Sequence, residues 1–392
     1  MKTLTTTQHL ADFCSAAAQH PYVTVDTEFL RERTYYSKLC LIQIAYPGEG
    51  DEHAVLVDPL SPDISLDPLY DLFRNEAVIK VFHAARQDLE IFFIDAGVIP
   101  KPLFDTQVAA MVCGFGDQVG YETLVRKVAK QSLDKSSRFT DWSRRPLTDA
   151  QKTYALADVT HLRVIYEKLA AKLAKNKRAH WVEEELQTLT NPETYITRPE
   201  EAWKRVKTRT HSARMLGIVR ALAEFRETHA QSSNIPRNRV FKDDALIELA
   251  STKPQSFDDL QRSRLLLREA RKGDIAKGIL AAVSQALALE SEQLPKVDKK
   301  EDAVDSNPAL SEMLRVLLKA KTENLGVAPK LVASASDLDA MAAGERNLEM
   351  LRGWRGEVFG DEAKRLCQGE IGLVAKGRFV ATFEIPKQLG AD

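Results

Sequence analysis

The sequence predicts an α/β domain with a mixed sheet and helices on its faces, followed by two small all-helical domains. Three observations lead to this prediction. Strand-like and helix-like segments alternate over the first part of the chain. The segment 191–199, which contains two prolines, then breaks the pattern. Beyond it only helical periodicity is found, and at roughly 150 residues per domain 392 residues allow two or three domains.

Four segments of the first part have the composition of strands. The second is almost continuously apolar, which is typical of a central strand covered on both faces. The first three follow one another closely and should pair as hairpins. The fourth is flanked by helical segments, so the sheet should be mixed. The four segments are Tyr22–Asp26, Leu39–Ala45, Ala54–Asp58 and Ile79–Phe82.

The helices are predicted from caps and periodicity. Thr148 and Gln151 form a capping-box pattern, so a long helix should run from Thr148 to Ala171, and another helical stretch covers Trp181–Leu189. After the break, apolar residues recur at helical spacing near 215–225, 246–250 and 310–318. A charged linker, Pro295–Asp302, separates the last two groups. We therefore expect domains at 1–195, 208–292 and 305–392.

The composition of the chain restricts its cellular location and the kinds of partner it can bind. The net charge is −1, so the whole-chain balance does not point to nucleic acid. The four cysteines form no Cys-x-x-Cys pair, which argues against a zinc site or a disulfide framework. No apolar run approaches the roughly 20 residues needed to cross a bilayer, and the first residues lack the apolar core of a secretory signal. We expect a cytoplasmic protein with no membrane partner.

Carboxylates recur in three contexts. Asp26 and Glu28 end the first strand and point to the same face, where two carboxylates suit a hard divalent cation. Tyr154 and Asp158 share one face of the long helix. Asp88 lies where a helix should begin, and the helix dipole alone would favour it there. Taken singly, each feature is better explained without a metal, by a solvated surface for the two pairs and by the helix dipole for Asp88.

Together, in this order, these features resemble the DEDD exonuclease superfamily in its tyrosine variant, and more closely bacterial ribonuclease D. The helical tail resembles HRDC modules through the turn Asn234–Val240, while the part beyond Asn307 matches less distinctly. The resemblance implies a ribonuclease H-like exonuclease domain followed by two HRDC-like domains. The matching stretches are Val25–Phe29, His83–Glu90, Phe104–Thr106, Asp141–Leu147 and Tyr154–Asp158.

The resemblance also implies roles for single residues. Asp26, Glu28, Asp88 and Asp158 would hold two Mg²⁺ or Mn²⁺ ions, and Tyr154 would orient the attacking water. The related histidine variant needs a histidine at position 153, which is threonine here. We interpret Asp105 as a helix cap, and His83 and His161 as structural. The segment Gly114–Gly120 lacks the spacing of a nucleotide-binding loop, and no Gly-Lys-Ser/Thr occurs, so no nucleotide cofactor is expected.

The implied activity is 3′→5′ hydrolysis of RNA with a free 3′ end, releasing nucleoside 5′-monophosphates, with transfer-RNA precursors as the implied substrate. Two basic stretches suit a phosphate backbone: 126–145 has seven Lys and Arg against two acids, and 201–240 has nine against three. Solvated helix faces would explain the second equally well. A DNA exonuclease or a non-catalytic RNA-binding scaffold remain the alternatives. The candidate substrate contacts are Phe29, Arg138, Arg144 and Arg145.

Overall fold

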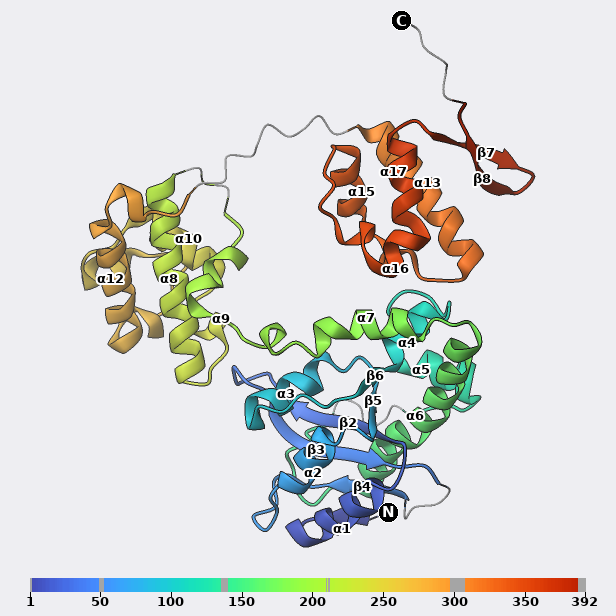
Figure 1. Cartoon of the computed structure of the whole chain (residues 1–392). Helices are drawn as coiled ribbons and strands as arrows, with labels where there is room; N and C mark the ends of the chain where they lie inside the picture. The colour runs from blue at the N-terminus through green and yellow to red at the C-terminus, as the bar shows by residue number, and fades with distance from the viewer. Residues whose placement is uncertain are drawn as a thin grey trace, which may run out of the picture.

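The computed structural model describes residues 2–48, 53–134, 140–208, 210, 212–296 and 307–386. An α/β domain holds the N-terminus, and two smaller modules lie against it (Figure 1). We refer to residues 199–296 as the first helical module and to residues 307–386 as the C-terminal module. No helix within these described ranges is long and apolar enough to cross a membrane.

The α/β domain is built on a six-stranded mixed sheet in the order β1-β4-β3-β2-β5-β6. The pairs β2·β3 and β3·β4 are antiparallel, whereas β1·β4, β2·β5 and β5·β6 are parallel. The predicted hairpins and the mixed sheet are therefore confirmed. The strands are β1 (Lys2–Leu4), β2 (Tyr22–Leu30), β3 (Lys38–Ala45), β4 (Ala54–Val57), β5 (Ile79–Phe82) and β6 (Leu103–Asp105).

Two of these strands, β1 and β6, are not in the prediction, and β2 runs four residues past the predicted end at Asp26. Both missed strands have three residues, which is too short for a period of two to be recognised. They are edge strands, and each pairs with one neighbour only. The extension of β2 matters for function, because it places Glu28 inside a paired strand.

Helices cover both faces of the sheet. Apolar side chains of β2, β3 and β4 pack on one face against α1, α2 and α3, and the other face packs against α6. The predicted capping box is present: Thr148 accepts from the amide of Gln151, and α6 extends to Lys175. The helices are α1 (Thr7–Ala17), α2 (Asp67–Arg74), α3 (Arg86–Ala96), α4 (Thr106–Val112), α5 (Tyr121–Leu124), α6 (Asp149–Lys175) and α7 (Ala179–Leu189).

The first helical module has its own apolar core and is all-helical within its described residues, as predicted. It begins earlier than the predicted residue 208, because Ala202 and Val206 belong to this core. A 3₁₀ helix, Pro199–Arg205, carries Ala202 and packs along α8. The α-helices are α8 (Ala213–Ser232), α9 (Arg237–Val240), α10 (Asp243–Thr252), α11 (Phe257–Arg262) and α12 (Gly273–Ala288).

The C-terminal module corrects the prediction of an all-helical domain. It ends in an antiparallel hairpin of β7 (Ile371–Lys376) and β8 (Phe379–Glu384), which turns at Gly377. Valine, isoleucine and phenylalanine in this segment favour a strand, and the helical tail in front of it led to the wrong extrapolation. The helices are α13 (Pro308–Leu325), α14 (Pro329–Val332), α15 (Ala335–Ala342), α16 (Gly353–Arg355) and α17 (Asp361–Cys367).

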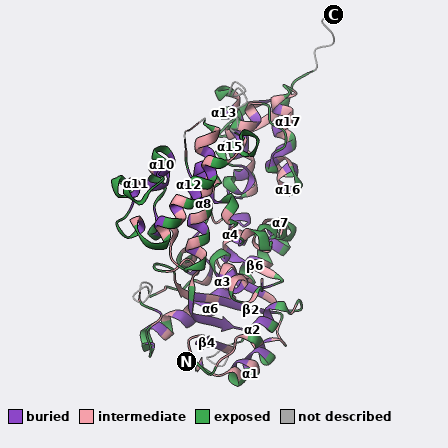
Figure 2. Ribbon diagram, turned by 90° about the vertical axis from the view of Figure 1, so that its left-hand side faces the viewer, coloured by how far each residue is buried: buried purple, intermediate pink, exposed green. Residues whose placement is uncertain are grey.

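The two modules attach to the α/β domain in different ways. The C-terminal module shares one continuous apolar core with α4, α6 and α7, and Trp181 stacks on Trp354 with ring centroids 4.5 Å apart. The first helical module is joined mainly by polar contacts to the loop after β2. There Asn234 Oδ1 accepts from the amides of Tyr35 and Tyr36 at 3.1 and 3.0 Å. Figure 2 shows buried residues in the sheet and in the helices of both modules.

Candidate active site

Three carboxylates meet where β2 passes under α6. Asp26 and Glu28 on β2 and Asp158 on α6 each offer an oxygen, and these oxygens lie within 4.8 Å of one another. Alternation along the strand sends Asp26 and Glu28 to the same side. Thr24 marks that side as the one facing α6, because its hydroxyl donates to the carbonyl of Val159 at 2.8 Å. The register shifts directly after Glu28, where the strand leaves its regular pairing.

Asp88 lies beside this cluster, in the first turn of α3 as predicted. Its side chain is buried and accepts a hydrogen bond from the hydroxyl of Thr27, the residue between Asp26 and Glu28. Its oxygens are not among those that meet within 4.8 Å. The structure thus brings three of the four predicted ligands together and holds the fourth against the same strand.

Electrostatics at the site favour a bound cation. Burial raises the pKa of Asp26 to about 6. The pKa of Asp88 is raised well above its usual range, first by burial and then by the negative charge of Asp26. Carboxylates that repel one another in a buried site are stabilised by a positive charge between them. An all-oxygen donor set suits magnesium or manganese, so the residues fit the predicted cations.

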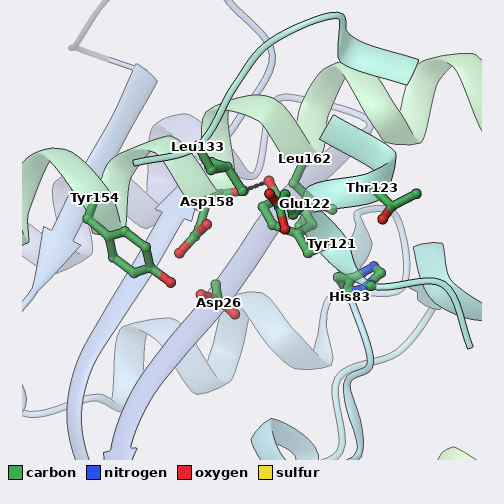
Figure 3. A pocket seen from close by; sticks show the side chains of 10 residues that line it. Asp26, His83, Tyr121, Glu122, Thr123, Leu133, Tyr154, Asp158 and Leu162 are labelled. Atoms are coloured by element: carbon green, nitrogen blue, oxygen red, sulfur yellow. Dashed lines mark hydrogen bonds between the residues drawn. The ribbon is translucent and has the colours of Figure 1, made fainter. Parts of the chain in front are cut away.

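A cavity of about 280 Å³ opens over Asp26 and Asp158. Asp26, Tyr154 and Asp158 line one part of it, and in Figure 3 both side chains from α6 extend towards Asp26. The spacing of four residues on α6 puts the phenol and the carboxylate on one helical face, as predicted. The cavity can therefore hold the end of a substrate against the carboxylates and the phenol.

The opposite wall contains residues that the sequence analysis did not assign to the site. Tyr121 and Glu122, at the start of α5, line the cavity, and the Tyr121 hydroxyl donates to the backbone carbonyl of Asp158. Burial, then the charges of Asp158 and Asp26, raise the pKa of Tyr121 well above its usual range, so it stays a donor. The sequence offers one signal for Tyr121 and Glu122, which is their position directly after the glycine-containing loop.

His83 also lines this cavity, although we expected a structural role for it. Its Nδ1 lies 3.0 Å from the hydroxyl of Thr106. Burial lowers the pKa of His83, so the ring is neutral at pH 7 and carries one donor and one acceptor. The predicted cap role of Asp105 is confirmed. It accepts from the amides of Gln107 and Val108 at the start of α4, and from the amides of Ala84 and Ala85.

The residues predicted to contact the substrate lie in different environments. Phe29 is half-buried and packs against the core between the sheet and α1, α2 and α3. Arg144 is exposed, and Arg138 lies outside the described residues. Arg145 makes a two-pronged ion pair with Asp58 at 2.6 Å for both contacts.

The remaining donors of Arg145 reach the carbonyls of Cys40, Trp142 and Arg144 at 2.6 to 2.9 Å. Every N–H of this guanidinium is thus used within the protein. The structure therefore supports a structural role for Arg145 in place of the predicted contact with RNA.

Comparison with known proteins agrees with this geometry. Residues 1–174 match a family model described as 3′-5′ exonuclease, and residues 215–283 match the HRDC domain. Ribonuclease D from Jannaschia sp. (strain CCS1) is 63% identical over 98% of this chain and 99% of its own length. Ribonuclease D from Granulibacter bethesdensis is 47% identical over 96% and 94%.

A solved structure gives the same result. The crystal structure of Escherichia coli RNase D, described as an exoribonuclease involved in structured RNA processing, superimposes with a TM-score of 0.81. It is 31% identical, and the match covers 94% of this chain and 98% of that one. On this evidence the chain belongs to the ribonuclease D family of 3′→5′ exoribonucleases.

Proposed function

We propose that this exoribonuclease uses two divalent cations, Mg²⁺ or Mn²⁺, held by Asp26, Glu28, Asp88 and Asp158. The observation that carries the proposal is the meeting of carboxylate oxygens from β2 and α6 within 4.8 Å, beside the buried Asp88. Bound there, divalent cations stabilise the negative charge of a reacting phosphodiester and lower the pKa of water.

The residues of the chain position the reactants. A phenol, with its ordinary pKa near 10, is a poor base at neutral pH, so Tyr154 orients the attacking water through its hydroxyl. Tyr121 holds the α6 backbone at Asp158 through its hydrogen bond to that carbonyl. The neutral ring of His83 offers a further polar contact on the cavity wall.

The proposed substrate is RNA with a free 3′ end, shortened to release nucleoside 5′-monophosphates. We further propose transfer-RNA precursors as the physiological substrate, since that is what membership of the family suggests. Phe29 and the exposed Arg144 are proposed contacts for the RNA. A cytoplasmic location is consistent with four free cysteines. A DNA exonuclease and a non-catalytic RNA-binding scaffold are the competing functions.

One experiment separates these functions. A 5′-labelled RNA, the DNA of the same sequence and the RNA with a blocked 3′ end are incubated with magnesium, manganese or EDTA. We expect a ladder that shortens from the 3′ end for the free RNA only, and no cleavage in EDTA. The matched control is Asp158→Asn, which keeps the shape of the side chain and should leave all three substrates intact. Cleavage in excess chelator contradicts the cation proposal, and faster cleavage of DNA contradicts the substrate.

A further inference from the structure

A second polar cavity, of about 470 Å³, lies between the α/β domain and the first helical module. On one side it is lined by Arg31, which follows β2, and by Thr34. Arg205 and Arg237 line the other side. It shares no lining residue with the catalytic cavity.

This cavity adjoins the elements that carry the catalytic carboxylates. Arg31 is three residues beyond Glu28 and makes a two-pronged ion pair, at 2.9 and 3.2 Å, with Glu90. Glu90 is two residues beyond Asp88 on α3. A substrate strand that leaves the catalytic cavity past this end of β2 would therefore meet the second cavity next.

The lining has three arginines, Arg31, Arg205 and Arg237, against two glutamates, Glu90 and Glu227, so its net charge of +1 favours an anion. Arg31 and Glu90 neutralise each other, and Glu227 accepts a hydrogen bond from the hydroxyl of Tyr35. The side chains of Arg205 and Arg237 make no hydrogen bond or ion pair with any described residue. Two guanidinium groups without a partner, facing one cavity, are typical of a site for phosphate oxygens.

The lining also contains buried polar atoms without partners. Thr34 Oγ1 and Glu227 Oε2 are buried, and neither has a hydrogen-bond partner among the described residues. Buried polar atoms are ordinarily satisfied, and the Thr34 hydroxyl can donate to a phosphate oxygen, whereas the Glu227 carboxylate oxygen only accepts and supports no phosphate contact. Hydrogen bonds also hold this wall in place. Gln231 on α8 donates to the hydroxyl of Tyr35 and to the carbonyl of Thr197, and Asn234 in the following turn accepts from the amide of Tyr35.

We propose that this cavity binds the backbone phosphates of the RNA chain upstream of its 3′ end, through Arg205 and Arg237. The inference rests on the proposed RNA substrate and adds a subsite to it. It singles out these two cations from the basic stretch 201–240 as the ones that contact the substrate.

The test compares two double variants that remove the same charge from the same module. Arg205→Gln with Arg237→Gln alters the cavity. Arg262→Gln with Arg268→Gln alters exposed arginines that do not line it. Each enzyme is assayed on an RNA trimer and on an RNA of 15 nucleotides, with Kd for the longer RNA measured from 50 to 200 mM salt.

We expect the cavity variant to lose about tenfold or more in kcat/KM on the long RNA and to keep the wild-type value on the trimer. The slope of log Kd against log salt should fall by about 1.4, since each phosphate contact on a single strand contributes roughly 0.7. The control variant should lose less on both measures. Equal behaviour of the two variants, or an equal loss on both substrates, would overturn the proposal.

One further outcome would also count against the proposal. If the cavity variant lost inhibition by inorganic phosphate but kept its affinity for the long RNA, the cavity would be a free-anion site and the proposal would fail. Failure of the catalytic proposal is distinguishable from this, because it is read from cleavage of the trimer by the wild-type enzyme in EDTA.

A different observation concerns Gln43, in the middle of β3. Its side chain is completely buried, and neither its amide nitrogen nor its amide oxygen has a hydrogen-bond partner among the described residues. It is paired in register with Asp26, so both side chains leave the same face of the sheet, under α6. Its neighbours on that face, Leu41 and Ala45, are apolar core residues.

An apolar side chain of the same length would pack here without burying an unpaired amide. We infer that Gln43 is a positioning residue for Asp26, to which its amide can donate a hydrogen bond when the carboxylate holds a cation. Carboxylates that bind metals are normally held by such outer hydrogen bonds. This inference also rests on the proposed cation site.

The test is Gln43→Met, with Thr24→Val as the control on the same face. We expect Gln43→Met to melt at the same or a higher temperature in EDTA, and to bind Mn²⁺, followed by electron paramagnetic resonance, about 10 to 100 times more weakly. Thr24→Val should melt lower, because it loses the bond to Val159, and should keep its Mn²⁺ affinity. A Gln43→Met protein that melts lower and binds Mn²⁺ normally would show that Gln43 is only structural.

Discussion

Asp58 and Asp88 are equally buried, each 7% exposed, but their surroundings are opposite. Asp58 receives both prongs of the Arg145 guanidinium, so its charge is compensated within the protein. Asp88 has Asp26 beside it, and that second negative charge raises its pKa. The first aspartate is therefore built for stability. The second has a geometry that becomes favourable only when a cation binds.

The largest expected effect is on turnover. Asp88→Asn removes a charge from the crowded carboxylates, so kcat should fall by roughly a thousandfold, in line with the loss of one well-placed electrostatic group. Its melting temperature in EDTA should stay the same or rise, because repulsion with Asp26 is relieved. Activity assays and thermal melts of the same preparation check both. If Asp88→Asn melted lower than the wild type in EDTA, Asp88 would stabilise the metal-free fold as Asp58 does, and the difference between the two aspartates would be wrong.

The opposite pattern is expected for Arg145→Ala. It leaves the buried Asp58 without a compensating charge, although the amide of Leu60 still donates to it, so the free energy of unfolding should fall by about 3 kcal/mol, the lower end for a broken buried pair. Denaturant titration measures this, and Arg144→Ala, at the exposed neighbouring position, should change stability by less than about 0.5 kcal/mol. If Arg145→Ala instead weakened RNA binding and kept its stability, the original prediction of a substrate contact would be right.

Tyr154→Phe separates the effect of polarity from the effect of charge, because it removes a hydroxyl group of the site without changing any charge. We expect kcat to fall by roughly a hundredfold, the lower range for a positioned catalytic group, and RNA affinity to remain nearly unchanged. The ring packs against the core under α6 and is retained, so the melting temperature should change by at most about 4 °C, the effect of losing one hydrogen bond. Wild-type turnover would show that the phenol only packs.

The smallest effect is a pH dependence of stability. The pKa of Asp26 is about 6 in the folded protein and near 4 in an unfolded chain, so the folded state binds more protons between these values. In EDTA, the melting temperature should therefore fall by a few degrees as the pH rises from about 4 to about 6, relative to Asp26→Asn. Added Mg²⁺ should reverse the fall above pH 6. An identical pH profile for wild type and Asp26→Asn would contradict the raised pKa.

Local pattern was enough to predict much of this protein. Some features depend on neighbours within four residues, and the structure contains them: the strand at Leu39–Ala45, the capped helix from Thr148, the position of Asp88 in the first turn of a helix and the cap at Asp105. The spacings of Asp26 with Glu28 and of Tyr154 with Asp158 are local features of the same kind, because each pair lies within four residues. A strand repeats every two residues and a helix every 3.6, so each pair shares a face wherever its element lies.

Other features were decided by packing between distant segments. Arg145 meets Asp58 across 87 residues, and no local signal distinguishes it from the exposed Arg144. The placement of Tyr121 and His83 on the cavity wall depends on how α5 and β5 pack against α6. The core shared between the C-terminal module and α7 also forms by packing between segments far apart in the chain. Sequence periodicity determines which face of an element is apolar, whereas only the tertiary structure determines which charge or core that face meets, because burial and charge pairing depend on segments far apart in the chain.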